Sequence, residues 1–172
     1  MLLWLDLETM GLDTMDPIIE IAAALTDNGM GGIYATYHSV IYLSYPDRRH
    51  YMGSFAWKMH QGSGLLGQTR DAPILGVVRR DFVTWLATHS KGEEPMLAGD
   101  SVHFDRRFLA HHMPAVIPML HYRQIDVSSI REARKAADLF VPTKARGHRA
   151  LEDIAESIAH YRMYLDSMRV DV

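Results

Sequence analysis

Apolar and polar residues alternate over the first eight positions of the chain. Leu3, Leu5 and Leu7 fall on one side of an extended backbone, and Asp6 and Glu8 fall on the other. A period of two residues is typical of a β-strand with unlike faces. The pattern therefore predicts a strand over residues 2–8 that carries two acids on one face.

Two more strands are predicted to follow in hairpins. The pair Asp16-Pro17 indicates a turn into a strand over residues 18–26, and a glycine-rich turn leads into a strand over residues 33–43. Residues 44–70 show no long period, apart from one short helix expected around residues 55–59. Because hairpins join antiparallel strands, the first half of the chain predicts an antiparallel sheet.

The second half of the chain alternates between helical and extended patterns. Apolar residues recur at helical spacing from Ile74 to Leu86, and a short apolar strand follows at residues 96–99. The predicted order is a helix over 73–89, a strand over 96–99, a helix from 104 that ends before Pro114, a strand over 121–127, a helix from Ser128 or Ser129 to 140, and a last helix around 151–165. Crossovers through helices give parallel strands, so we expect an α/β fold with a mixed five-stranded sheet flanked by helices.

Composition narrows the class of protein. The 172 residues fit one domain over residues 1–172, with 48% apolar and 23% charged residues. No apolar run approaches the roughly 20 residues of a membrane helix, and the early acids argue against a secretory signal. The absence of cysteine excludes disulfides and thiolate metal sites, and it fits a reducing cytoplasm.

The net charge of −3 bears on the kind of partner. Proteins that bind long nucleic acids usually carry a basic surface, because neutralised phosphates supply much of their affinity. A nucleic-acid substrate of this chain is therefore expected to be short and held at one site, with metal ions supplying much of the positive charge.

Four acids on three predicted elements are candidate metal ligands. Asp6 and Glu8 share a strand face, Asp105 begins a helix after the fourth strand, and Asp153 lies in the first turn of the last helix. Read separately, the first two could mark an exposed strand end, and the other two could be ordinary first-turn acids. If they converge, their oxygen ligands suit two ions of Mg²⁺ or Mn²⁺, which stabilise attacking and leaving oxygens in phosphodiester cleavage.

His148 is the candidate general base. A neutral imidazole with a pKa of about 6.5 can accept a proton from water near neutral pH. His148 precedes Asp153 by five residues, so both side chains reach one site if His148 lies at or before the start of the last helix.

These positions together resemble a known family. Asp6-x-Glu8, Asp105, and His148 five residues before Asp153 are similar to the DEDDh exonuclease superfamily, and longer strings resemble its oligoribonucleases. Those strings are Trp4 to Glu8, Gly11-Leu12-Asp13, Ser63-Gly64-Leu65, Asp105 to Leu109, His121-Tyr122-Arg123 and Asp126-Val127-Ser128. The resemblance implies a ribonuclease-H-like fold and a homodimeric, metal-dependent 3′-to-5′ exonuclease that degrades short RNA, dinucleotides especially, to 5′-mononucleotides.

The resemblance also implies roles for substrate-binding residues. Leu12 would wedge between two bases, while Trp57 and His60 would line the base pocket. Ser101, Arg123 and Ser128 would cap the 5′ phosphate, with charge added by Arg131, and Tyr122 would reach into the partner's site. Ordinary roles stay open, because Leu12 and Trp57 could be core residues and Ser128 could be a helix cap.

The chain departs from the family pattern in three places: Thr9-Met10, where the family usually has these two residue types in the reverse order, residues 31–51, which show little likeness, and Asp100. Asp100 stands where the family usually has Asn, beside the implied phosphate cap. We expect its charge to be paired, with Arg106 or Arg107 as candidates.

Two other functions remain in competition. A proofreading or repair-type 3′-to-5′ DNA exonuclease would use the same catalytic residues in an open groove. A catalytically silent nucleic-acid-binding dimer would keep the fold without the chemistry.

Overall fold

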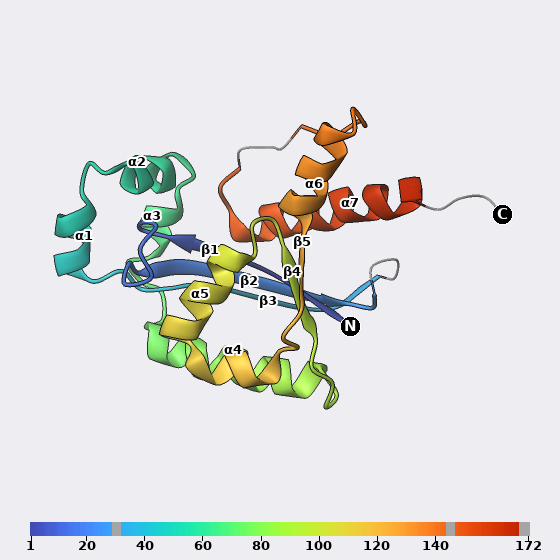
Figure 1. The fold of residues 1–172 in the computed structure, drawn as a ribbon. Helices are drawn as coiled ribbons and strands as arrows, with labels where there is room; N and C mark the ends of the chain where they lie inside the picture. The colour runs from blue at the N-terminus through green and yellow to red at the C-terminus, as the bar shows by residue number, and fades with distance from the viewer. Residues whose placement is uncertain (29–31, 144–146, 169–172) are drawn as a thin grey trace.

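The computed structural model describes residues 1–28, 32–143 and 147–168 (Figure 1). Its centre is a five-stranded mixed sheet in the order β3-β2-β1-β4-β5. The strands are β1 (Leu2–Thr9), β2 (Ile18–Thr26), β3 (Ile33–Val40), β4 (Met96–Gly99) and β5 (Gln124–Asp126). β2 pairs antiparallel with β1 and β3, and β4 pairs parallel with β1 and β5, so the predicted mixed α/β sheet is confirmed.

Helices cover both faces of this sheet. The helical elements are α1 (Tyr45–Tyr51), α2 (Phe55–Gly62), α3 (Leu65–Gln68), α4 (Leu75–His89), α5 (His103–His112), the 3₁₀ helix η1 (Pro114–Met119), α6 (Val127–Ala136) and α7 (Ala150–Met168). In Figure 1, α4 lies on one side of the sheet, and α6 and α7 lie on the other. Among the described residues, no helix combines the length and the apolar character needed to cross a bilayer.

The alternation in β1 decides which residues meet which helices. Leu3 and Leu5 are buried among residues of α4 and α5, while Trp4 is buried among residues of α7. Asp6 and Glu8 have the parity of Trp4, so the two acids belong to the face that α7 covers. The strand period thus directs both acids toward the last helix of the chain.

The segment after β3 corrects one expectation. Residues 44–70 were expected to be irregular with one short helix, but they contain α1, α2 and α3. The side chains of Ser44 and Ser54 accept hydrogen bonds from the first turns of α1 and α2, so short helices begin where no long apolar period exists. Capping by these serines favours α1 and α2, and the period of apolar residues does not predict such short helices.

Several boundaries also differ from the expected ones. β3 ends at Val40 instead of 43, β5 has only three residues, and α6 ends at Ala136 instead of 140. The cap of α6 is Asp126, whose carboxylate accepts from Ser128 N, so neither Ser128 nor Ser129 caps the helix. η1 follows α5 directly, at the point where Pro114 was expected to end the helix.

The close approach of β4 to β1 requires a glycine. A Cβ built on Gly99 would lie 2.8 Å from the carbonyl oxygen of Leu5, which belongs to the backbone of the central strand. Gly99→Ala is therefore expected to lower the free energy of unfolding by about 1–3 kcal/mol, measured by denaturant titration.

Gly76→Ala is the matched control for that substitution. Gly76 lies in α4, and a Cβ there would have no neighbour within 4 Å. This variant should be as stable as the original protein or slightly more stable. Equal stability of the two variants would contradict the proposed crowding at Gly99.

Candidate functional site

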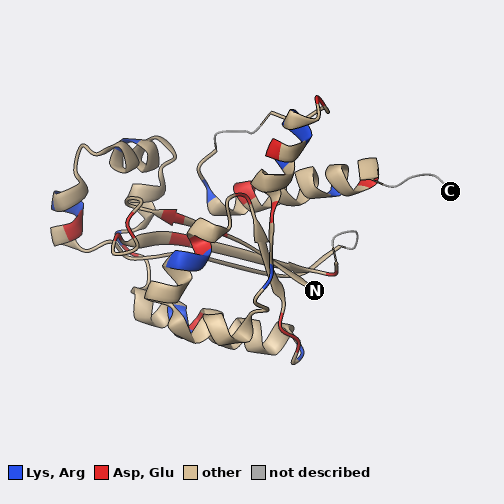
Figure 2. Cartoon of the chain, viewed as in Figure 1, with Lys and Arg blue, Asp and Glu red and all other residues tan. Residues whose placement is uncertain are grey.

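Three predicted metal ligands meet beside the start of α7. Asp6 and Glu8 come from β1 and Asp153 comes from the first turn of α7, and each offers an oxygen within 4.8 Å of the others. Glu8 is buried, and Asp6 and Asp153 are half-buried. Figure 2 shows acidic residues, in red, on the central strands of the sheet, between the helices that cover its two faces. Like charges held this closely in a partly dry site repel one another unless a cation offsets them.

Asp105 lies next to this group but is held differently. Its carboxylate is buried and accepts a hydrogen bond of 3.0 Å from the backbone N–H of Leu7, the residue between Asp6 and Glu8. Burial raises the pKa of Asp105 well above its usual range, and the neighbouring charge of Glu8 raises it further, against the Leu7 bond. The structure thus brings Asp105 to the same stretch of β1 without including it in the group of three.

His148 lies two residues before α7 and has a left-handed backbone (φ 49°). It lines a pocket of about 540 Å³ with residues of α2, including Phe55 and Lys58. The prediction that His148 precedes the helix and Asp153 lies inside it agrees with the observed positions.

His60 connects α2 to the end of β1. Its ring is fully buried, Nε2 lies 2.9 Å from the carbonyl oxygen of Thr9, and Nδ1 lies 3.8 Å from a carboxylate oxygen of Glu8. Because a carbonyl only accepts, Nε2 carries the proton. Burial lowers the pKa of His60, and the neighbouring His148 lowers it further. His60 therefore lies beside Glu8, and the role implied for it in lining the base pocket stays a prediction.

An apolar pocket of about 480 Å³ adjoins Glu8. Leu12 from the loop after β1 and Phe55 from α2 both line it, and their side chains are 81% and 84% exposed. Residues with so much exposed apolar surface beside a cluster of acids are candidates for contact with flat bases.

Trp57 does not line this pocket. It lines a different pocket with Tyr42 and Arg48, and it packs against the buried cluster around Leu43 and Leu66. Residues two apart in a helix point in nearly opposite directions, so Phe55 and Trp57 face different sides of α2. The aromatic residue that α2 contributes beside the acids is thus Phe55, which we had not selected, although the predicted helix around residues 55–59 could have separated the two faces.

Two serines of the implied phosphate cap come together. The hydroxyl oxygens of Ser101 and Ser128 lie 3.4 Å apart, and one oxygen of Asp126 accepts from Ser101 N, Ser128 N and Ser128 Oγ. Burial raises the pKa of Asp126, but the bonds from Ser128, His103 and Ser101 outweigh it and leave the pKa lowered. Asp126 is a second residue that we had not selected.

Arg123 and Tyr122 lie on an exposed turn. The Tyr122 side chain is 73% exposed, and the Arg123 guanidinium lies over its ring, 5.2 Å from the centroid. Such exposure leaves both side chains available to a second molecule, and the roles implied for them stay predictions.

The pairing of Asp100 also differs from the expectation. Asp100 pairs with Arg131, which was not among the two candidates, with a distance of 2.9 Å between the nearest oxygen and nitrogen. α6 places Arg131 one turn after Ser128 and directs it to the residue before Ser101. The charge of Arg131 is therefore engaged with Asp100 rather than added to the phosphate cap.

Known proteins with similar sequences identify the family of this chain. The family model described as Exonuclease (RNase_T) matches residues 3–161. A probable oligoribonuclease of Dictyostelium discoideum is 38% identical over 95% of this chain and 87% of its own length. The mitochondrial oligoribonuclease of Mus musculus is 35% identical over 97% of this chain and 73% of its own length. The chain belongs to the exonuclease family.

Solved structures agree with this assignment at the level of the fold. The nuclease domain of 3′hExo, a DEDDh family member solved with rAMP bound, superposes with a TM-score of 0.57 at 14% identity, over 96% of this chain and 92% of that domain. The predicted resemblance to oligoribonucleases, the ribonuclease-H-like fold and the class of exoribonuclease are confirmed.

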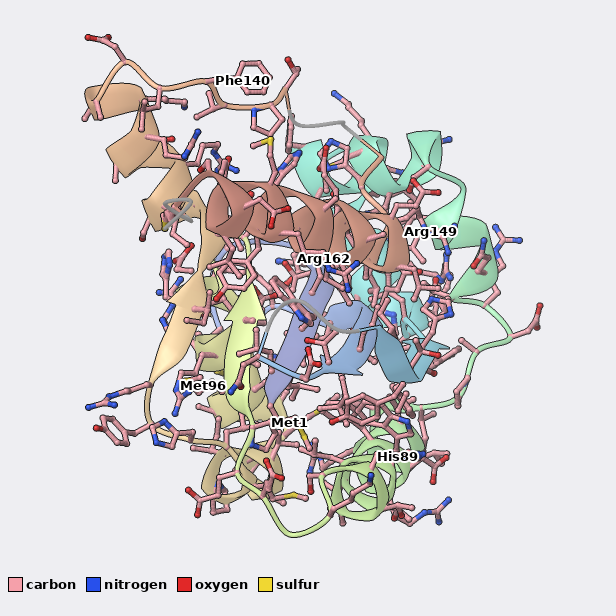
Figure 3. The ribbon with its side chains drawn as sticks, turned by 90° about the vertical axis from the view of Figure 1, so that its right-hand side faces the viewer. Met1, His89, Met96, Phe140, Arg149 and Arg162 are labelled. Carbon is pink, nitrogen blue, oxygen red and sulfur yellow. The ribbon has the colours of Figure 1, made fainter. Side chains whose placement is uncertain are left out.

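A buried acid on β2 fixes the helix on which this exonuclease carries Asp153. Glu20 pairs with Glu8 in the sheet register and is fully buried. Its carboxylate accepts from Arg149 Nη2 at 2.8 Å and from Ala150 N at 3.0 Å, the residue that begins α7. His38 Nε2 lies 2.8 Å from the same carboxylate. Figure 3, where Arg149 is labelled, shows α7 lying across the sheet from this end.

The contact between Glu20 and Arg149 favours the charged form of both side chains. Burial raises the pKa of Glu20, but bonds from Arg149, His38 and Ala150 prevail, and its pKa is lowered. The bond to Glu20 raises the pKa of Arg149. An acid within the apolar run of residues 18–26 was a visible signal for this contact that the sequence reading did not use.

The loop that carries Leu12 is also held by an acid. Asp16 accepts from Asp13 N at 2.9 Å and from the Tyr51 hydroxyl at 2.6 Å. A Cβ on Gly11 would collide with the Asp16 carboxylate, so glycine lets the loop close over it. The exposed position of Leu12 is therefore set by α1 and by the loop itself.

Glu20→Gln tests whether this contact holds α7 in place. Loss of the charge should lower the free energy of unfolding by about 1.5–3 kcal/mol, the value of a hydrogen bond to a charged group, as measured by denaturant titration. Nuclease activity should fall as well, because Asp153 lies about one helical turn after Ala150, whose N–H is bound by Glu20.

Glu132→Gln is the control for Glu20→Gln. Glu132 pairs with Lys135 on the exposed face of α6, so its loss should change neither stability nor activity. A Glu20→Gln protein with the stability and activity of the control would show that α7 is positioned by other contacts.

Proposed function

We propose that this exonuclease removes nucleotides from the 3′ ends of very short RNA, with dinucleotides as a preferred substrate. The observation that carries the proposal is the group of Asp6, Glu8 and Asp153 beside a pocket lined by Leu12 and Phe55. The relatives at 35% and 38% identity are named oligoribonucleases, which favours RNA over DNA.

The donor set fits divalent cations. Carboxylate oxygens are the ligands that Mg²⁺ and Mn²⁺ prefer, and the closeness of three acids is costly without positive charge. Asp6, Glu8 and Asp153 would hold a first ion, and Asp105 would join them for a second. When bound, two ions would stabilise the charge on the attacking and leaving oxygens of the phosphodiester.

The side chains around the acids would perform the remaining steps. His148 would accept the proton of the attacking water, because it is presented at the start of α7 on a pocket shared with α2. His60 would keep α2 against the end of β1 through Thr9 and Glu8. Leu12 and Phe55 would hold the bases apart and in place by apolar contact.

The far end of the substrate would meet Ser101 and Ser128. Their hydroxyl oxygens lie 3.4 Å apart at the start of α6, so both could donate to one phosphate group. A 5′ phosphate bound there would leave no room for a longer chain, which supports a preference for short substrates. Arg123 would add charge from the exposed turn.

A homodimer is part of the proposal. Tyr122, which is largely exposed on the turn before β5, would reach the site of the second subunit. The protein is expected in the cytoplasm, although the mouse relative is named as mitochondrial.

Cleavage of a matched pair of substrates tests the proposal. A 5′-labelled RNA dinucleotide should be hydrolysed faster than a DNA of about twenty residues in Mg²⁺ or Mn²⁺, because the phosphate cap excludes longer chains. His148→Ala should reduce kcat by roughly 10²–10⁴-fold, as loss of a general base does. Asp153→Asn should abolish cleavage.

Asp81→Asn is the control for these variants, since Asp81 is exposed on α4 and pairs with Arg80. It should retain full activity. Faster turnover of the long DNA would reject the RNA assignment in favour of a repair-type enzyme. A folded original protein without hydrolysis of either substrate would favour a silent binding dimer.

A further inference from the structure

A second pocket lies on the side of α2 that faces away from the acids. Its volume is about 510 Å³, and it is formed by the segment after β3, α1, α2 and Arg70. Phe55 faces the pocket beside Glu8, whereas Trp57 faces this second pocket, so α2 separates the two. None of the roles proposed above uses it.

The polar lining of this pocket is basic. Arg48, Arg49 and Arg70 contribute to it, and none of its lining residues, all of which the structure describes, is acidic. This concentration of guanidinium groups stands out in a chain with a net charge of −3. Such a lining attracts anions.

Arg48 and Arg70 both line this pocket and also a smaller adjoining pocket of about 220 Å³. The Arg48 side chain is half-buried and donates to the carbonyl oxygens of Leu43 and Leu66 and to Thr69 Oγ1, which are uncharged acceptors. Burial lowers the pKa of Arg48, and the charge of Arg70 lowers it further. Because both arginines line the pocket, an anion bound between them would relieve the repulsion of their like charges.

The remaining lining offers flat apolar surfaces. Tyr45 and Met52 are 69% and 65% exposed, and Tyr42 and the half-buried Trp57 complete the wall. Aromatic rings of this kind stack on nucleobases without regard to sequence. Guanidinium groups match the geometry of phosphate oxygens.

We propose that this pocket binds a 5′-phosphorylated nucleotide, with the base against Trp57 and Tyr45 and the phosphate against Arg70 and Arg48. The ligand is either a free mononucleotide or one nucleotide residue of an RNA chain. The site is separate from the acid group, and its occupancy does not depend on divalent cations.

Tryptophan fluorescence tests this site directly. Trp4 is buried in the sheet and Trp85 packs against Phe82, so Trp57 is the tryptophan that a ligand in this pocket would contact. AMP titrated into the full-length protein in EDTA should quench the emission and saturate, and Trp57→Phe should remove the quenching. The Asp153→Asn variant should respond like the original protein, which makes this readout independent of the proposed nuclease activity.

Substitutions of the lining identify the contacts. Arg70→Gln should weaken AMP binding roughly tenfold or more, as expected from losing a charged hydrogen bond, and Tyr45→Ala should weaken it as well. Arg80→Gln is the control, because Arg80 is an exposed arginine on α4 that pairs with Asp81. Unchanged AMP affinity in both lining variants would overturn the proposal.

Titration with different ligands distinguishes a free mononucleotide from a nucleotide residue of an RNA chain. Inorganic phosphate should bind much more weakly than AMP, and equal binding would overturn the assignment to a nucleotide. A five-residue oligoribonucleotide that binds more tightly than AMP, with the same dependence on Arg70, would identify an RNA chain as the source. Tighter binding of AMP would identify the free mononucleotide.

Discussion

The ion pair between Glu20 and Arg149 determines where α7 begins, and the site depends on that starting point. Glu20 is the neighbour of Glu8 across the sheet, and it receives both the Arg149 guanidinium and the first N–H of the helix. One turn later, the helix places Asp153 over β1. A single buried carboxylate therefore aligns a residue near the end of the chain with acids near its beginning.

The resulting site concentrates negative charge where water is scarce. Glu8 and Asp105 are buried, and burial together with the Glu8 charge raises the pKa of Asp105. A fold that kept this arrangement without a compensating cation would carry an unfavourable electrostatic energy. The same architecture keeps apolar contacts nearby on Leu12 and Phe55, so metal ligands and base contacts lie side by side.

The sequence was sufficient to predict what depends on local period. The alternation of β1 placed Asp6 and Glu8 on one face, and the apolar spacing of the last helix placed Asp153 in its first turn. The motif around His148 completed the family assignment. These features depend on residues that are close in the sequence, so they could be predicted from the sequence alone.

Several contacts between distant segments were not predicted. The pairing of Asp100 with Arg131 joins residues 31 positions apart, and Glu20 meets residues about 130 positions away. The choice between Phe55 and Trp57 depends on which side of a short helix faces the acids, and that side is fixed by packing around Leu43 and Leu66. Asp126, and not Ser128, caps α6, and its carboxylate also accepts a hydrogen bond from Ser101 N, 25 residues earlier in the chain.

Calorimetric titration of Mn²⁺ into the protein tests most directly whether the three acids share a cation. The account predicts saturable binding to the original protein, weakened by roughly tenfold or more in Asp6→Asn and in Asp153→Asn, since each removes a charged ligand. The exposed-acid variant Asp81→Asn should bind Mn²⁺ with the original affinity. Equal affinities in all four proteins would mean that these carboxylates do not hold the metal.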